Sequence, residues 1–281
     1  MQKLPEEPLA SINAKIEYYQ QELEELKNQK EFPYLYIMVA LPVTAVFLLL
    51  AVISDGLVDF TAAITGALFF SLLITCAYLV LYQPNREELE NQIQRQLATL
   101  YREKSKLEAG LKGEREVAYI LSWLPKEFIT INNVYLAAGD LEVQQFDHIV
   151  VGPPGVIHLE TKTINGAVLI DPKGNWTVLK ASQNKIIREG MDSPLPQMQR
   201  HEMILQNFLQ QEFPGENIPI YGIVVMGNSR TIVEGEDPRL TVLKRDKLNE
   251  YIKSLPAPAP LSQDLINKIA LALIEHHRDL S

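Results

Sequence analysis

The chain has 281 residues, of which 47% are hydrophobic and 22% are charged, which is the composition of a folded protein with one or two domains and excludes a disordered chain. Its 26 Lys and Arg against 35 Asp and Glu give a net charge of −9, which argues against a protein that coats nucleic acid through bulk charge. A single cysteine, Cys76, excludes an internal disulfide framework and a zinc site built from several thiolates.

Two stretches in the first third of the chain, residues 34–53 and 60–82, contain no charged residue. Helices of this length rise about 1.5 Å per residue and would match a hydrocarbon core of roughly 30 Å. The turn between them is acidic, and basic residues flank the pair. The sequence therefore predicts a two-span transmembrane hairpin over 32–84 in the cell (inner) membrane, with the lipid bilayer as a partner and both termini cytoplasmic. A pair of buried core helices is the alternative.

Apolar residues recur at spacings of three and four on either side of this hairpin, in an N-terminal arm over residues 1–31 and a second arm over 85–111. Both arms are expected to be helices with one apolar seam. Antiparallel packing within one chain would join Leu23 to Ile93, Tyr19 to Leu97 and Ile16 to Leu100, pairs whose residue numbers have a constant sum. We expect a coiled-coil stalk, and pairing between chains, which would give a homo-oligomer, stays open.

From about Gly110 to Ser281 the chain alternates short apolar runs with amphipathic segments, which is typical of one α/β domain. The expected helices are 114–124, 194–213 and a C-terminal helix over 262–277, and the expected strands are 128–136, 146–151, 155–162, 167–170, 176–179 and 218–226. The run Gly152-Pro153-Pro154-Gly155 predicts a turn that folds the second strand back against the third.

The chemistry-bearing residues lie in that hairpin. Glu160 and Lys162 are two apart on a strand and face the same side, and the turn can bring Asp147 opposite them. Two carboxylates suit Mg²⁺ or Mn²⁺, and a nearby ammonium can position a water or stabilise phosphoryl charge. The pattern favours phosphodiester hydrolysis. Glu-x-Lys alone is a weak signal, and a surface ion pair between Glu160 and Lys162 is the alternative.

Several ordered motifs add to this signal. They are Gly113-Glu114-Arg115-Glu116-Val117, Phe146-Asp147-His148-Ile149-Val150-Val151-Gly152, Gly155-Val156-Ile157-His158-Leu159-Glu160-Thr161-Lys162, Gly174-Asn175-Trp176 and Ser193-Pro194-Leu195-Pro196-Gln197. Together they resemble the nuclease-related domain (NERD), a branch of the PD-(D/E)xK nuclease superfamily. The family often has Asn-Pro where this chain has Ser193-Pro194.

The resemblance implies a restriction-endonuclease-like fold, with a central mixed sheet flanked by helices. It also implies residue roles. Asp147 and Glu160 would be metal ligands, Lys162 the catalytic lysine, and Glu114 a catalytic residue on the first helix. Gln197 would orient the substrate or a water.

Other side chains have plainer interpretations. The basic residues Lys173, Lys180, Lys185 and Arg188 are a candidate path for a phosphate backbone, with a solvated face as the alternative. We expect His158 to be a packed residue and Trp176 to lie in the core, and we expect His148 to face away from Asp147. His276 and His277 are expected at a solvated helix end.

These observations predict a membrane-anchored, divalent-metal-dependent nuclease that hydrolyses phosphodiester bonds of DNA or RNA at the cytoplasmic face, with DNA favoured over RNA as the partner. Two other functions stay open. One is a non-catalytic, membrane-tethered module that binds nucleic acid. The other is an interaction or signalling protein that uses a nuclease-like fold as a docking platform.

Overall fold

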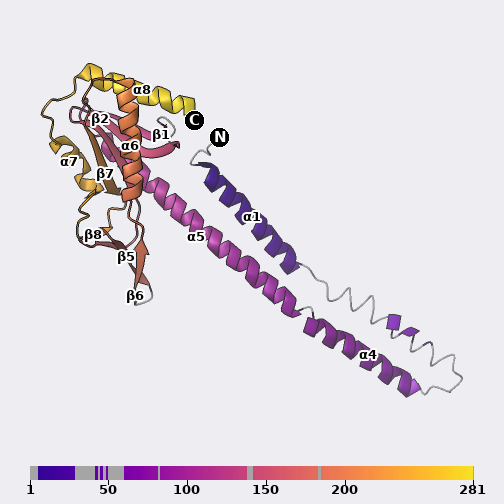
Figure 1. The fold of residues 1–281 in the computed structure, drawn as a ribbon. Coiled ribbons are helices and arrows are strands. Elements are labelled where there is room, and N and C mark those ends of the chain that lie inside the picture. The colour runs from indigo at the N-terminus through magenta and orange to yellow at the C-terminus, as the bar shows by residue number, and fades with distance from the viewer. Residues whose placement is uncertain are drawn as a thin grey trace. The chain divides into compact units, whose positions relative to one another are not determined.

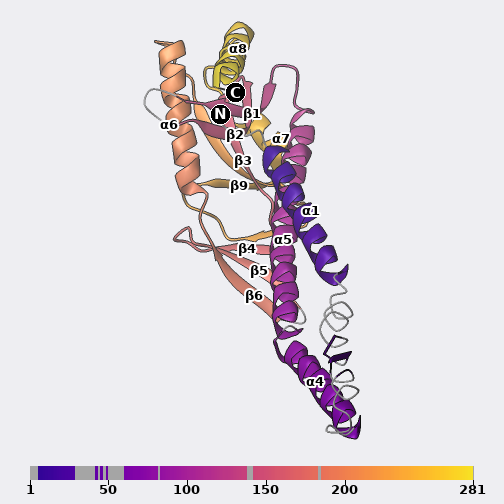
Figure 2. The same ribbon diagram turned by 90° about the vertical axis from the view of Figure 1, so that its right-hand side faces the viewer.

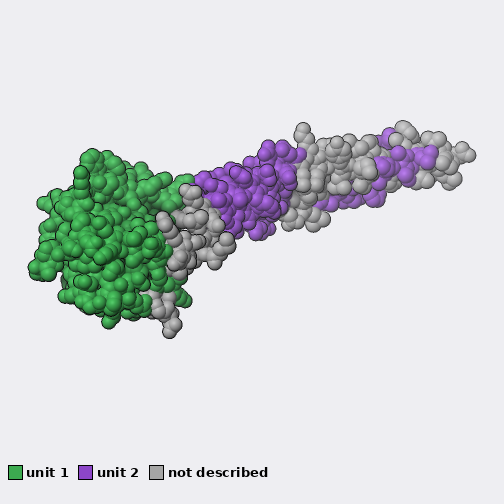
Figure 3. Space-filling model, turned by 90° about the horizontal axis from the view of Figure 1, so that it is seen from above, with its two compact units in different colours: residues 1–2, 106–281 green, residues 3–105 purple. Residues whose placement is uncertain are grey.

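The computed structural model describes residues 6–28, 60–81, 83–137, 142–182 and 185–280, with a few positions between 42 and 49. These residues form two compact units, one over Lys3–Ser105 and one that consists mainly of Lys106–Ser281. Figure 3 shows the two units in different colours. Each unit is described by itself.

The first unit contains α1 (Glu6–Asn28), α4 (Phe60–Leu81) and the beginning of α5 (Gln83–Leu121). The apolar seams of α1 and α5 pack into one cluster, in which Ile16, Ile93, Leu97 and Leu100 are buried. Arg86 donates a hydrogen bond to the carbonyl of Leu26 at 2.7 Å, and Gln20 donates one to the hydroxyl of Tyr101 at 2.9 Å. A high number in one helix therefore meets a low number in the other, which is antiparallel packing within one chain. Nothing among the described residues supports a supercoil or an oligomer.

The predicted transmembrane hairpin is not upheld. Residues 60–81 do form the helix α4, whereas most of 34–53 lies outside the described residues. In the part of the chain that the structure describes, no helix has both the length and the apolarity that a membrane span requires. The prediction of two spans, an inner-membrane location and cytoplasmic termini is therefore wrong, and the lipid bilayer is not supported as a partner. It rested on the absence of charged residues over 34–53 and 60–82, and most of the first of these stretches lies outside the described residues.

The second unit is built on a five-stranded sheet with the order β1-β2-β3-β7-β9. Its strands are β1 (Ile129–Leu136), β2 (Gln144–Gly152), β3 (Gly155–Lys162), β7 (Ile220–Met226) and β9 (Thr241–Lys244). β1, β2 and β3 are antiparallel neighbours, whereas β3, β7 and β9 run parallel. The sheet is therefore mixed, in agreement with the expected α/β fold. The carboxyl ends of β3, β7 and β9 therefore lie at the same end of the sheet.

Helices cover both faces of this sheet (Figure 2), which explains why β3 carries apolar residues on both of its faces. On one face, Val117 and Leu121 of α5 pack with Ile157 and Leu159, together with residues of α7 (Leu248–Ser254). On the other face, Val156 packs with apolar residues of α6 (Leu195–Glu212) and α8 (Gln263–Leu280). The register of β3 is fixed because a shift by one residue would exchange the two cores.

A smaller four-stranded sheet has the order β6-β5-β4-β8. Its strands are β4 (Ala167–Ile170), β5 (Trp176–Ser182), β6 (Lys185–Met191) and β8 (Ile232–Glu234). Trp176 is 2% exposed and its indole N–H donates to Asp237 at 3.0 Å, so its predicted place in the core is confirmed. β6 is exposed along most of its length, at the outer edge of this sheet (Figure 1).

The last turns of α8 are not a solvated helix end. A ring nitrogen of His276 lies 2.9 Å from the carbonyl oxygen of Ala137, and the backbone N–H of Tyr135 donates to Nδ1 of His277 at 3.2 Å. The His277 ring also stacks on Tyr135, with 5.7 Å between centroids. The prediction for His276 and His277 is therefore wrong, because both histidines bind the end of β1, about 140 residues away in the chain.

Candidate active site

Glu160 and Lys162 lie at the carboxyl end of β3, where the strand leaves the buried core. Alternation along the strand places both on the same face, and Lys162 Nζ donates to Glu160 Oε1 at 2.7 Å. Glu160 is only 5% exposed, so its charge is desolvated and requires partners. The ion pair is therefore a partly buried feature and not the surface pair that was the alternative.

Gln197, in the first turns of α6, completes a closed set of hydrogen bonds. Its Nε2 donates to Glu160 Oε2 at 2.7 Å, while its Oε1 accepts from Lys162 Nζ at 3.1 Å. The amide thus bonds both members of the ion pair and restricts the lysine ammonium to one position. We call Glu160, Lys162 and Gln197 the triad.

Asp147 approaches the triad from β2. β2 and β3 pair as far as His148↔Leu159, and one step further the same register places Asp147 opposite Glu160. There the backbone N–H of Thr161 donates to Asp147 Oδ2 at 2.7 Å. The carboxylate of Asp147 therefore takes a hydrogen bond that a strand carbonyl would otherwise accept, which fixes its place beside β3.

Burial and neighbouring charge at this end of the sheet change the ionisation of Asp147 and Glu114. Burial raises the pKa of Asp147 to about 8; the charge of Glu160 adds to this rise, and the hydrogen bond from Thr161 opposes it. Burial also raises the pKa of Glu114 on α5, again with a contribution from Glu160. The structure therefore brings together all five residues that the resemblance singled out: Glu114, Asp147, Glu160, Lys162 and Gln197.

A divalent cation fits this donor set. Burial and the charge of Glu160 disfavour negative charge on Asp147, and a cation bound there would offset both effects. Among the described residues no group of three or more His, Cys, Asp or Glu could hold a metal ion. Mg²⁺ does not need such a group, because it usually keeps several waters and binds one or two carboxylates together with substrate phosphates. Asp147 and Glu160 are the two carboxyl groups here that could hold such an ion.

The four basic residues suggested as a phosphate path lie elsewhere, on the smaller sheet and its turn. Lys173 is in the turn between β4 and β5, Lys180 is on β5, and Lys185 and Arg188 are on β6. Lys180 forms an ion pair with Glu189. The described hydrogen bonds of the triad include none of the four.

The histidines near the triad are packed residues, as expected for His158. Its ring lies 5.8 Å from that of His201 on α6, and Phe146 contacts both. Burial lowers the pKa of His158 to about 3 and that of His201 to about 4, so both are neutral. His148 is also buried, and its Nδ1 lies 2.7 Å from Asn132 Oδ1.

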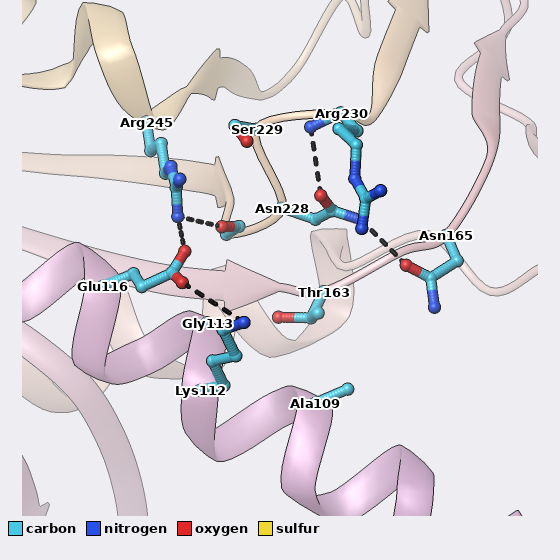
Figure 4. Close-up of a pocket in the computed structure, with 11 residues that line it drawn as sticks. Ala109, Lys112, Gly113, Glu116, Thr163, Asn165, Asn228, Ser229, Arg230 and Arg245 are labelled. Atoms are coloured by element: carbon cyan, nitrogen blue, oxygen red, sulfur yellow. Dashed lines mark hydrogen bonds and ion pairs between the residues drawn. The ribbon is translucent and has the colours of Figure 1, made fainter.

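A polar pocket of about 250 Å³ beside the triad was not predicted from the sequence (Figure 4). It is lined by residues of α5 and of the loops that follow β3, β7 and β9: Ala109, Lys112, Gly113, Glu116, Thr163, Asn165, Gly227, Asn228, Ser229, Arg230 and Arg245. Two glycines in the sequence could have indicated the close approach of α5 to the sheet at this pocket. A Cβ on Gly113 would lie 2.0 Å from Thr163 Oγ1, and one on Gly227 would lie 3.0 Å from the Cα of Gly113.

Comparison with protein families gives a match over residues 109–227 to the model of the nuclease-related domain, NERD. This confirms the resemblance inferred from the motifs. The matched segment contains the triad together with Glu114 and Asp147, and it ends just after β7. Comparison with curated proteins and with solved structures gave no match.

Proposed function

We propose, from the match of residues 109–227 to the nuclease-related domain, that this chain is a divalent-metal-dependent nuclease that hydrolyses phosphodiester bonds of DNA or RNA. The triad is the observation that carries the proposal. Its lysine is oriented by two hydrogen bonds, to Glu160 and to Gln197, beside a second buried carboxyl, Asp147. An oriented cation next to paired carboxylates suits a reaction in which negative charge develops on phosphoryl oxygens.

Asp147 and Glu160 would hold Mg²⁺ or Mn²⁺. When bound, the ion would act as a Lewis acid on a phosphoryl oxygen and lower the pKa of a coordinated water. Lys162 would place its ammonium beside the phosphate and stabilise the developing charge, while Gln197 keeps that ammonium in position. Glu114, whose pKa is raised by burial, would accept or donate a proton during the reaction.

Asp147 would link cation binding to pH. Because its pKa is about 8, its carboxyl group is largely protonated at neutral pH when no cation is bound. A cation that binds there must displace this proton, so affinity for the cation should rise as pH increases toward 8.

A second function is favoured by one observation. Both oxygens of Glu160 already accept hydrogen bonds, from Lys162 and from Gln197. A carboxylate in a closed set of this kind can be purely structural, and the domain would then bind nucleic acid without cleaving it.

The test uses the purified full-length chain with single-stranded DNA, duplex DNA and RNA, each with Mg²⁺ or Mn²⁺. We expect cleavage that stops with EDTA and falls by about 10²–10⁴ in Lys162→Ala, the usual scale for one positioned catalytic group. Glu160→Gln should lose cleavage and cation affinity together, measured by Mn²⁺ calorimetry, whereas Lys162→Ala should keep the affinity. A folded chain that binds neither cation would contradict the proposal, and cation binding without cleavage would favour the binding module.

A further inference from the structure

Two aromatic side chains stand out on the surface of the second unit. Tyr119 is 64% exposed and Trp123 is 71% exposed, and their rings meet edge to face with centroids 6.0 Å apart. Tyr119 is in the last turns of α5, and Trp123 follows in the turn that ends this helix. The backbone N–H of Trp123 donates to the carbonyl of Ile120 at 3.1 Å. Exposed aromatic faces of this kind are what stacked nucleobases use.

A groove of about 420 Å³ runs from Tyr119 toward the polar pocket of Figure 4. Its lining residues are Lys112, Arg115, Glu116, Tyr119, Ile120 and Arg245, and it shares Lys112, Glu116 and Arg245 with the pocket. The groove and the pocket therefore adjoin at these three residues. We call the groove, the pocket and the Tyr119–Trp123 pair the α5 surface.

The α5 surface is basic although the protein is acidic. Its charged residues are four bases, Lys112, Arg115, Arg230 and Arg245, and one acid, Glu116. Arg245 forms an ion pair with Glu116 (Figure 4) and donates a hydrogen bond to the carbonyl of Gly227. Both of these contacts use Nη1 of Arg245, so they leave its Nε and Nη2 donors for a ligand. Neither Arg115 nor Arg230 forms an ion pair with another described residue.

This surface begins next to the triad. Gly113 in the pocket precedes Glu114, Thr163 follows Lys162, and the N–H of Gly227 donates to the carbonyl of Lys162 at 3.1 Å. The absence of a side chain at Gly113 lets α5 approach this closely, because a Cβ there would collide with Thr163. The pocket and the triad are therefore neighbours at the carboxyl ends of β3 and β7.

We propose that the α5 surface binds a single-stranded segment of the nucleic acid, with phosphates in the pocket beside Arg230 and Arg245 and unpaired bases on Tyr119 and Trp123. This inference rests on the proposed function and specifies its substrate. The segment is single-stranded because the base faces of a duplex are occupied by neighbouring base pairs, so only unpaired bases can stack on protein rings. The basic side chains of Lys112, Arg115, Arg230 and Arg245 supply the sequence-independent attraction to phosphates.

Tryptophan fluorescence tests the proposal in the full-length chain. The protein has two tryptophans, and since Trp176 is buried, a stacking ligand changes the emission of Trp123. The titration is run in EDTA, with an oligothymidine of about twelve nucleotides, with the corresponding duplex, and with a polyglutamate peptide. We expect the oligothymidine to quench the emission, with an affinity that falls as salt rises and that exceeds the affinity for the duplex.

Variants provide the second measurement, through the anisotropy of a labelled oligonucleotide. Trp123→Ala should weaken binding about tenfold, and Trp123→Phe, which keeps an aromatic face, should recover most of that loss. Tyr18→Ala is the matched control, since Tyr18 is an aromatic of similar exposure in the other unit, at 61%, and should have no effect. Arg230→Ala should weaken binding and reduce its salt dependence.

Three results would overturn the proposal: duplex bound as tightly as single strand, an unchanged affinity in Trp123→Ala, or quenching by polyglutamate equal to that by the oligonucleotide, which would indicate an acidic protein partner. Because no cation is present, binding here is independent of cleavage. Binding that depends on Trp123 in a chain that never cleaves would contradict the proposed function alone. Cleavage of single strands that is unchanged in Trp123→Ala would contradict this inference alone.

Discussion

Two groups of charged residues were picked out of the sequence, and the structure treats them differently. Asp147, Glu160 and Lys162 lie on two neighbouring strands of the main sheet, where a fixed register and two buried cores determine which side each residue faces. The basic residues of the smaller sheet lie on a hairpin that is mostly exposed. The charged residues of the main sheet come together because the buried cores fix the register of its strands. The hairpin of the smaller sheet is mostly exposed, so burial does not bring its basic residues together.

The register of that hairpin separates its bases. In the pairing of β5 with β6, Lys180 is opposite Ile187, and Leu179 is opposite Arg188. Because side chains alternate between faces, Lys180 and Lys185 lie on one face and Arg188 on the other. Lys180 and Lys185 therefore do not form one path with Arg188 along a single face. Residues that are close in the sequence can lie on opposite faces of a hairpin, and the strand register decides which of them lie together.

After that of Lys162→Ala, the largest effect that would sharpen this contrast is expected at Gln197. Gln197→Ala should reduce the cleavage rate by about 10- to 100-fold, because Lys162 would lose one of the two hydrogen bonds that orient it. The measurement is single-turnover cleavage at saturating protein. Gln199→Ala, an exposed glutamine on the same helix, is the control and should cleave at the normal rate. Equal rates in the two variants would show that the triad is not a catalytic unit.

The sequence predicted best what local pattern decides. The bounds of β3 and β4 agree with the predicted strands 155–162 and 167–170, because apolar runs between turn residues define them. β6 was missed, since its exposed residues show no apolar alternation. The predicted helix 114–124 is the end of α5, which runs unbroken from Gln83 to Leu121. The predicted arm over 85–111 and this helix are therefore parts of one element, and Gly113 within it allows close packing against Thr163.

Contacts between distant segments were beyond reach of the pattern. Register and the short turn predicted the approach of Asp147 to Glu160, but the contact of Gln197 with Glu160 spans 37 residues, and only the family resemblance suggested a role for Gln197. Arg230 and Arg245 lie after β7 and β9, in segments without a motif. Their shared pocket depends on the parallel order of β3, β7 and β9, which hydropathy does not reveal.

A smaller effect is expected on the stability of the main sheet, through Asp147. Its pKa is about 8 in the folded chain, against an ordinary value of 3.8. Between these two pH values the unfolded chain ionises this group while the folded chain keeps it protonated, so the group lowers stability progressively as pH rises from about 4 to about 8. Asp147→Asn removes this cost and keeps an acceptor for the N–H of Thr161.

Thermal unfolding without metal should therefore show a melting temperature of Asp147→Asn that exceeds that of the unchanged chain by a few degrees at pH 8 and by little at pH 5. The buried histidines also titrate, but they do so in both proteins, so the difference removes their contribution. Mn²⁺ should raise the melting temperature of the unchanged chain only. A variant that is less stable at every pH would contradict the assignment of a buried, protonated Asp147.

The smallest effect is expected on the exposed hairpin. A single phosphate backbone that lies along one face can contact Lys185 or Arg188, but not both. We therefore expect one of Lys185→Ala and Arg188→Ala to weaken oligonucleotide binding by about two- to threefold and to reduce the salt slope by about one. The other should leave the affinity unchanged, and Lys180→Ala should have little effect, because Glu189 already neutralises that charge. Salt-dependent anisotropy measures all three. If Lys185→Ala and Arg188→Ala each weakened binding tenfold, the nucleic acid would have to wrap both faces, and the hairpin rather than the α5 surface would be its main path.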